Sequence, residues 1–228
     1  ITATPDKGYE LEMLKVLDRS GDALKLTEKN GKYTFKMPSG KVTIKASFVE
    51  EVPEQIFKDV PANAYYYEAV KWAQEKGITG GIGNGLFGPN DPCTRAQIVT
   101  FLWRAAGSPE PETRAMPFTD IPVGSYYYDA VLWAVENDIT KGTSDTTFSP
   151  NMTCTRAQIV AFLWRSEKSP AAGTANPFAD VKSTAYYADA VLWAVKEDIT
   201  KGTTSTAFSP NTDCTRAQIV TFLWRCKK

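Results

Sequence analysis

The sequence predicts a mainly α fold in which three helix–loop–helix repeats follow a small all-β module. A block that begins with Phe-x-Asp and ends with Phe-Leu-Trp-Arg is written three times, opening at Phe57, Phe118 and Phe178, so the period is 61 and then 60 residues. Such periods are typical of repeat architectures. The first 50 residues lack this block and contain short alternating runs of β-branched and aromatic residues between glycine-containing turns, which is typical of strands.

Residues 1–50 predict the β-rich module. The runs 32–37 and 41–48 alternate, and the Pro-Ser-Gly sequence between them predicts the turn of a β-hairpin. An Asn-Gly pair at 30–31 marks another turn, and segments 1–4 and 9–17 could supply two more strands. The run Tyr-Thr-Phe-Lys-Met-Pro that begins at Tyr33 resembles the end of small all-β repeat modules found along Gram-positive surface proteins. Residues 50–54 predict a linker.

The first half of each repeat predicts a helix. In the first copy, residues 65–76 place Ala69, Val70 and Ala73 on one apolar face, and the pattern stops near Gly77. A loop with one glycine at a shared position and a Phe-x-Pro-Asn turn signal follows. The corresponding helices are predicted at 126–137 and 186–197.

The second half of each repeat predicts a helix with a defined start. Thr94 as N-cap and Gln97 three residues later form a capping box, which recurs in the other two copies at Thr155 and Thr215. The residue before each cap is a cysteine, in the position of a hydrophobic staple. We therefore interpret Cys93 and its two counterparts as small apolar packing residues rather than as redox or disulfide residues.

The repeats are predicted at 55–107, 116–168 and 176–228, joined by short linkers rich in proline, glycine and serine. Each copy is expected to be a separate unit. A two-helix unit of about 55 residues buries little surface by itself. We therefore expect the copies to pack around one shared centre or to stack as a short array.

The composition excludes several classes of function. The chain contains no histidine, which excludes Ser-His-Asp and Cys-His catalysis and most catalytic zinc sites. We expect no catalytic residues, no metal and no cofactor. The 26 basic residues balance the 26 acidic ones, so nucleic-acid binding is not expected. The longest apolar runs fall well short of a bilayer span, so membrane insertion is not expected either.

One arginine per repeat is the main candidate for function. Arg95, Arg156 and Arg216 each take the first helical position after the N-cap, where the helix dipole disfavours a cation by about 0.3–1 kcal/mol. A nearby negative group should compensate. One reading is an intramolecular carboxylate, for which each repeat offers one aspartate. The other is an anionic ligand held by the guanidinium together with free N–H groups at the helix start. The aspartates are Asp59, Asp120 and Asp180.

The triplicated pattern resembles the surface-layer homology domain, the cell-wall anchoring module of Gram-positive and related bacteria. The resemblance spans about residues 55–228 and rests on Phe-x-Asp-Val, the aromatic first helix, the glycine loop with Phe-x-Pro-Asn, and Thr-Arg-Ala. It implies a pseudo-three-fold bundle whose grooves hold secondary cell-wall polysaccharide, often capped by a pyruvylated amino sugar. Two features depart from the family: Gln97, Gln158 and Gln218 replace the usual glutamate, and tyrosines precede the first helix where many relatives carry a His-Trp pair.

Aromatic residues and glycines complete the predicted grooves. Tyrosine rings and hydroxyls suit a glycan, and we assign one tyrosine per copy to the groove and one to the interior. The tryptophans near the end of each second helix fit core or groove equally well. The loop glycines could let backbone approach a ligand, or could simply serve a turn with positive φ. The candidate ligand-binding residues are Arg95, Arg156, Arg216, Asp59, Asp120, Asp180, Gly81, Gly142, Gly202, Tyr66, Tyr127, Tyr187, Trp103, Trp164 and Trp224.

These observations predict a non-enzymatic, extracellular module that anchors a surface protein to cell-wall polysaccharide, as a fragment of a longer precursor. Three copies of one site favour multivalent binding, because avidity gains from copies while catalysis needs one assembled constellation. The alternative is a protein-interaction scaffold that self-associates in a surface lattice without binding glycan. A glycosidase would need two carboxylates about 5–10 Å apart in one cleft, whereas the aspartates are distributed one per copy.

Overall fold

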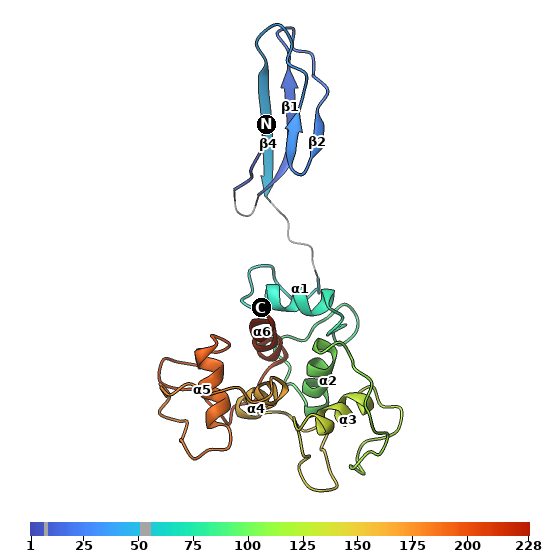
Figure 1. Ribbon diagram of the computed structural model, residues 1–228, viewed down its shortest axis with the longest axis vertical. Coiled ribbons are helices and arrows are strands. Elements are labelled where there is room, and N and C mark those ends of the chain that lie inside the picture. Colours follow the sequence, from blue (N-terminus) through green and yellow to red (C-terminus); the bar gives the residue numbers. More distant parts are fainter. Residues whose placement is uncertain (7–8, 51–55) are drawn as a thin grey trace. The chain divides into compact units, whose positions relative to one another are not determined.

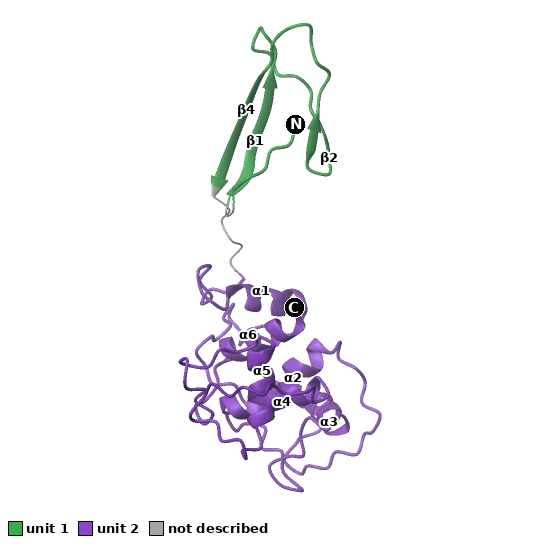
Figure 2. Ribbon diagram, turned by 60° about the vertical axis from the view of Figure 1, so that its left-hand side comes forward, with its two compact units in different colours: residues 1–54 green, residues 55–228 purple. Residues whose placement is uncertain are grey.

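The computed structural model describes residues 1–6, 9–50 and 56–228 and divides into two compact units, Ile1–Glu54 and Gln55–Lys228 (Figures 1 and 2). Of the predicted linker, residues 51–54 lie outside the described residues. In the described chain the first unit contains strands and the second contains six helices, in agreement with the predicted combination of a β module and helical repeats.

The first unit consists of two antiparallel pairs of strands. Strand β1 (Tyr9–Leu17) pairs with β4 (Thr43–Glu50), and β2 (Thr27–Lys29) pairs with β3 (Lys32–Thr34). The predicted hairpin between 32–37 and 41–48 is therefore wrong. Asn30 and Gly31, both with positive φ, make the tight turn between β2 and β3 instead. The physical reason is that two successive residues with positive φ match the twist of a two-residue hairpin, for which Asn-Gly is the preferred sequence.

The second unit is built from two kinds of helix. The first helices of the repeats are α1 (Tyr67–Glu75), α3 (Tyr128–Glu136) and α5 (Ala188–Lys196). The second helices are α2 (Arg95–Ala105), α4 (Arg156–Ser166) and α6 (Arg216–Lys227). All three predicted capping boxes are confirmed, because each cap threonine accepts from the N3 amide and each N3 glutamine side chain bonds the cap amide.

Helix packing crosses from one repeat to the next. Helix α2 packs against α3, α4 against α5, and α6 against α1, so each first helix lies against the second helix of a different copy. Figure 1 shows α2, α4 and α6 at the centre of the unit with α1, α3 and α5 around them. A nine-residue first helix therefore finds its apolar partner in another repeat, and the three copies form one compact unit.

The cysteines lie where the three repeats meet. Each cysteine N–H donates to the carbonyl of another copy's cysteine: Cys93 to Cys214, Cys154 to Cys93 and Cys214 to Cys154, at 2.9–3.0 Å. All three are free thiols and fully buried, in agreement with a packing role. Burial raises the pKa of Cys154 and of Cys214 to about 12, so these thiols stay protonated at neutral pH and are poor nucleophiles.

Candidate functional site

The arginine at the start of each second helix is buried and joins two repeats. Arg95 is 4% exposed, and its Nε donates to the carbonyl of Phe148 in the second repeat at 2.8 Å. Its guanidinium carbon lies 4.8 Å from the centroid of the Phe148 ring and 5.2 Å from that of Phe162. The same arrangement joins Arg156 to Phe208 and Arg216 to Phe87, so the three contacts run from repeat one to two, two to three, and three to one.

The N–H groups at these helix starts are also occupied. The amide of Arg95 donates to the carbonyl of Met152, and that of Ala96 donates to Pro150. The other two helices repeat this pattern with carbonyls of the next copy. The prediction that free helix-start N–H groups hold a ligand is therefore wrong, because loop carbonyls of the adjacent repeat satisfy them.

The aspartates do not pair with the arginines directly. Asp59 Oδ1 accepts from the amide of Phe87 at 2.7 Å, and its Oδ2 accepts from Gly88 at 2.8 Å. Asp120 and Asp180 hold Phe148 and Phe208 in the same way. Among the described residues no ion pair joins these carboxylates to the helix-start arginines.

A peptide group therefore stands between each pair of opposite charges. The Phe87–Gly88 peptide donates its N–H to Asp59 and accepts from Arg216 at its carbonyl. Carboxylate and guanidinium polarise this peptide in the same sense, which strengthens both hydrogen bonds. The compensation predicted for the arginine exists, but the phenylalanine carbonyl of another repeat supplies it.

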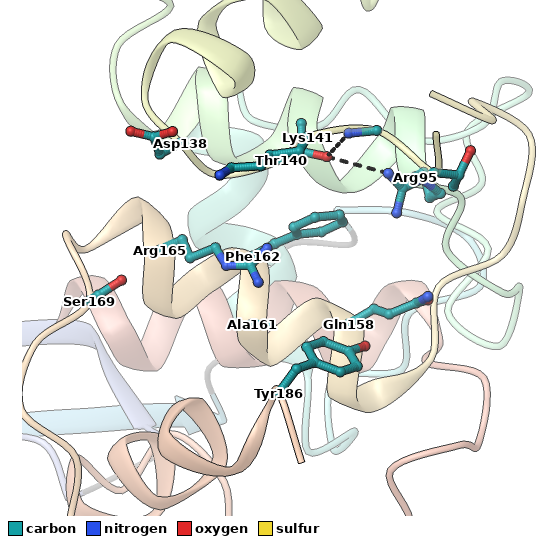
Figure 3. Close-up of a pocket in the computed structure, with 12 residues that line it drawn as sticks. Arg95, Asp138, Thr140, Lys141, Gln158, Ala161, Phe162, Arg165, Ser169 and Tyr186 are labelled. Carbon is teal, nitrogen blue, oxygen red and sulfur yellow. Dashed lines mark hydrogen bonds between the residues drawn. The ribbon is translucent and has the colours of Figure 1, made fainter. Parts of the chain in front are cut away.

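A groove forms beside this junction between the second and third repeats. This second groove has a volume of about 800 Å³ and combines residues from three copies. Arg95 comes from α2, Gln158 and Arg165 come from α4, and Tyr186 precedes α5; Figure 3 shows these side chains around one cavity. The loop 140–143 completes the lining. The hydroxyl of Thr140 in that loop accepts from Gly142 N at 3.2 Å and from Arg95 Nη2 at 3.4 Å.

The first groove has the same construction, with a volume of about 530 Å³. Its lining comprises the loop 79–82, Arg104 from α2, Tyr126 before α3, and Arg216 from α6. Nη2 of Arg216 is buried and meets no hydrogen-bond acceptor within the described residues, and the same holds for Nη2 of Arg156. Arg216 therefore brings to the lining of the first groove a positive charge with one unused hydrogen-bond donor.

At the third junction Tyr65 lies beside Arg156 and Arg225, and we call this cluster the third groove because it repeats the side chains of the first two. Burial raises the pKa of Tyr65 above its ordinary value, as does the neighbouring Cys214, while the charges of Arg156 and Arg225 act in the opposite direction. Burial also raises the pKa values of Tyr126 and Tyr186. Tyr126 lies beside Arg216 and Arg104, and Tyr186 lies beside Arg165 and Arg95. Each of the three tyrosines therefore lies beside one helix-start and one helix-end arginine.

The tyrosines that line the first and second grooves are Tyr126 and Tyr186 rather than the predicted ones, and the predicted set did not include a second arginine. Tyr65, Tyr126 and Tyr186 are 65%, 59% and 62% exposed. Tyr66, Tyr127 and Tyr187, which were predicted for the grooves, take the N-cap positions and pack partly against the core. Tyr187 does line a hollow, together with Asp180 and Ser209, but that hollow is separate from the groove linings. The helix-end residues Arg104, Arg165 and Arg225 were not predicted, although the triplicated Trp-Arg pair was the signal that could have found them.

The predicted tryptophans lie outside the linings of the first and second grooves. The indole N–H of Trp103 donates to the carbonyl of Pro109 at 2.8 Å, and that of Trp164 donates to Pro170 at 2.8 Å. Both hold the linker that follows their own helix. Trp224 has the Lys228 ammonium 4.5 Å from its ring centroid. All three are half-buried and pack against the core.

The loop glycines are required by their own loops. A Cβ on Gly142 would lie 2.5 Å from Phe118 Cε1 and 2.5 Å from the carbonyl oxygen of Thr147, at a φ of +85°. Gly81 and Gly202 show equivalent overlaps. Their backbone lies along the grooves, but the close approach that excludes a side chain is to the protein itself.

Gly142→Ala is expected to lower the free energy of unfolding by about 2–5 kcal/mol, the sum of left-handed strain and steric overlap. Gly124→Ala is the matched control, because Gly124 has a φ of +83° with no atom within 4 Å of an added Cβ. Urea unfolding of both variants separates strain from overlap. Equal losses of stability would contradict the overlap seen at Gly142.

Within the described part of the chain, no group of three or more His, Cys, Asp or Glu side chains could hold a metal ion. Among the described helices, none has the length and apolar character needed to cross a bilayer.

Comparison with known proteins agrees with this architecture. The S-layer homology domain matches residues 56–99, 117–160 and 177–220, and the Divergent InlB B-repeat domain matches residues 1–52. The chain is 31% identical over 159 residues to the Surface-layer 125 kDa protein of Lysinibacillus sphaericus, covering 68% of this chain and 13% of that protein. It is 34% identical over 115 residues to an Endoglucanase of Bacillus sp. (strain KSM-635), covering 50% and 12%.

A third relative is the Cellulosome-anchoring protein of Acetivibrio thermocellus, 29% identical over 150 residues, which covers 64% of this chain and 32% of that protein. The chain thus spans a third or less of the length of these relatives. The resemblance predicted from the repeated motifs is confirmed, as is the resemblance of the β module. The three matches to the repeat cover more than half of the sequence, and the chain belongs to the S-layer homology domain family.

Proposed function

We propose that this chain anchors a surface protein non-covalently to the cell wall by binding acidic secondary polysaccharide in the grooves between its repeats. The family is a cell-wall anchoring module of extracellular, cell-surface proteins. The names of two relatives, a surface-layer protein and a cellulosome-anchoring protein, support the same role for this chain. The single observation that carries the proposal is the grouping of two arginines and one tyrosine beside each groove.

This grouping fits an acidic sugar. The helix-end arginine uses one donor within the protein: Arg165 Nη1 bonds the carbonyl of Ile139 at 3.2 Å, and Arg104 Nη1 bonds Ile78 at 3.0 Å. Its remaining donors can form a charge-assisted pair with a carboxylate. Because the pKa of Tyr186 is raised by burial, its hydroxyl stays neutral and can donate a hydrogen bond, while its exposed ring can stack on a sugar face.

The proposal includes a pseudo-three-fold arrangement of the repeats. The arginine-to-phenylalanine contacts, the cysteine amides and the helix pairs each pass through all three copies and return to the first. Such an arrangement would give the second unit three comparable groups of two arginines and one tyrosine. Binding of one polymer through several grooves then gives avidity from sites of modest affinity.

Co-sedimentation with isolated Gram-positive cell wall tests the proposal. The chain is expected to pellet with walls that carry acidic secondary polysaccharide and to stay in the supernatant with walls stripped of that polymer. Raising the salt concentration should weaken pelleting, because exposed charge pairs are screened. Retention on stripped wall would contradict glycan anchoring and favour a protein-interaction or lattice scaffold, and pelleting without wall would identify self-association.

A further inference from the structure

The loops at corresponding positions of the three repeats differ at one charged position. The second groove has Thr140-Lys141-Gly142-Thr143, and the corresponding residues 200–203 of the third repeat have the same Thr-Lys-Gly-Thr sequence. The first groove has Thr-Gly-Gly-Ile at 79–82, which replaces the lysine by Gly80. Lys141 lines the second groove, and within the described part of the chain its ammonium forms no ion pair.

The grooves also differ in size and in surface chemistry. The second groove is about 800 Å³ against about 530 Å³ for the first. It shares Asp138, Arg165 and Ser169 with a further hollow of about 280 Å³ that Lys168 lines. In the first groove Ile82 is 50% exposed. The first groove therefore offers less room and a more apolar edge.

One acidic residue in the second groove partly offsets the positive charge of Lys141. Asp138 lines the cavity, whereas the first repeat has Gly77 at that position. Figure 3 shows Asp138 and Ser169 at the opposite end of the cavity from Gln158 and Tyr186. The carboxylate thus lies near the junction with the outer hollow, away from the end where Arg95 and Tyr186 lie.

We infer that the grooves are not equivalent: the second and third select an anionic sugar through Lys141 and Lys201, while the first binds it weakly and discriminates little against an uncharged sugar. This inference rests on the proposed function, since it concerns the same grooves. Lys141 and Lys201 are the residues that determine specificity, and Gly80 with Ile82 defines the weak groove.

The first groove can accept the missing cation. A Cβ added to Gly80 meets nothing within 4 Å, and its φ lies outside the positive range that strains other residues. Gly80→Lys should therefore introduce the lysine without disturbing the loop, and Gly80→Gln adds similar bulk without charge. Lys141→Gln makes the reverse change in the second groove.

The test uses the whole chain labelled with 3-fluorotyrosine, because one tyrosine reports each groove: Tyr126 the first, Tyr186 the second and Tyr65 the third. The probes are a methyl glycoside of pyruvylated N-acetylhexosamine, which carries one carboxylate, and the same glycoside without pyruvate. The charged probe should shift the ¹⁹F resonances of Tyr186 and Tyr65 at lower concentration than that of Tyr126. The preference for charged over uncharged probe should be smallest at Tyr126.

Gly80→Lys should strengthen the Tyr126 response to the charged probe by roughly 3- to 5-fold, the effect of one exposed charge pair. Gly80→Gln should leave it unchanged, and Lys141→Gln should weaken the Tyr186 response by a similar factor. Equal half-saturation of all three tyrosines, or a Tyr126 response unchanged by Gly80→Lys, would overturn this inference alone. No response of any tyrosine to either probe would overturn the proposed function and this inference with it.

Discussion

Simultaneous replacement of Arg95, Arg156 and Arg216 by alanine is expected to unfold the second unit rather than to release a folded protein from its ligand. Each substitution removes a charge-assisted hydrogen bond, worth about 1.5–3 kcal/mol, and a guanidinium held between two phenylalanine rings, worth about 0.5–2 kcal/mol. Three such losses, about 6–15 kcal/mol in sum, match the whole stability of a typical domain.

Thermal unfolding followed by near-ultraviolet circular dichroism measures this effect. The triple alanine variant should show no cooperative transition, and each single variant should melt well below the parent. Arg95→Lys separates charge from geometry, because lysine keeps the cation but cannot place a donor where Nε lies. A triple variant that melts like the parent would show that these arginines do not hold the repeats together.

The second large effect is expected from the helix-end arginines. Changing Arg104, Arg165 and Arg225 together to glutamine should leave the unit folded but abolish its retention on cell wall. Each change removes one charged partner for an acidic sugar, which we expect to weaken binding at that groove about 10-fold or more, the equivalent of about 1.4 kcal/mol. When three grooves hold one polymer, the losses multiply, so the affinity for cell wall should fall by about 1,000-fold or more.

The two triple variants control for each other, since both remove three positive charges from the same unit. The glutamine variant should lose only about 1 kcal/mol per site, for the hydrogen bond from each arginine to an isoleucine carbonyl. Arg-to-Lys changes at the same three positions should keep part of the binding. Unchanged co-sedimentation of a folded glutamine variant would remove the helix-end arginines from the mechanism.

The local features of the fold could be predicted from the sequence because local interactions determine them. The capping boxes involve Thr94 and Gln97, only three residues apart, and the structure shows both of their hydrogen bonds. The first residue of the first helix in each repeat was harder to predict than that of the second helix. In the first repeat, the first helix begins at Tyr67, not at Tyr65, and no side chain caps it. Since each helical residue turns the chain by about 100°, an error of one or two residues changes which tyrosine faces the groove.

The composition of the grooves could not be predicted, because it depends on contacts between repeats. The dipole argument correctly indicated that Arg95 needs a compensating group, but a carbonyl more than 50 residues away supplies it. Nothing in one copy tells which loop of another copy will meet its helix start. In the β module, the choice between two turns decided the strand pairing, and the Asn-Gly turn prevailed.

Each groove combines residues from more than one copy, so the loss of one copy affects more than one groove. The first groove takes Arg216 from the third copy, the second takes Tyr186 from it, and the cluster around Tyr65 takes Arg225 from it. Deletion of that copy would therefore destroy all three grooves at once and deprive α1 of the helix it packs against. If the grooves bind glycan as proposed, a chain with two copies would therefore lose all of its binding sites rather than one third of them.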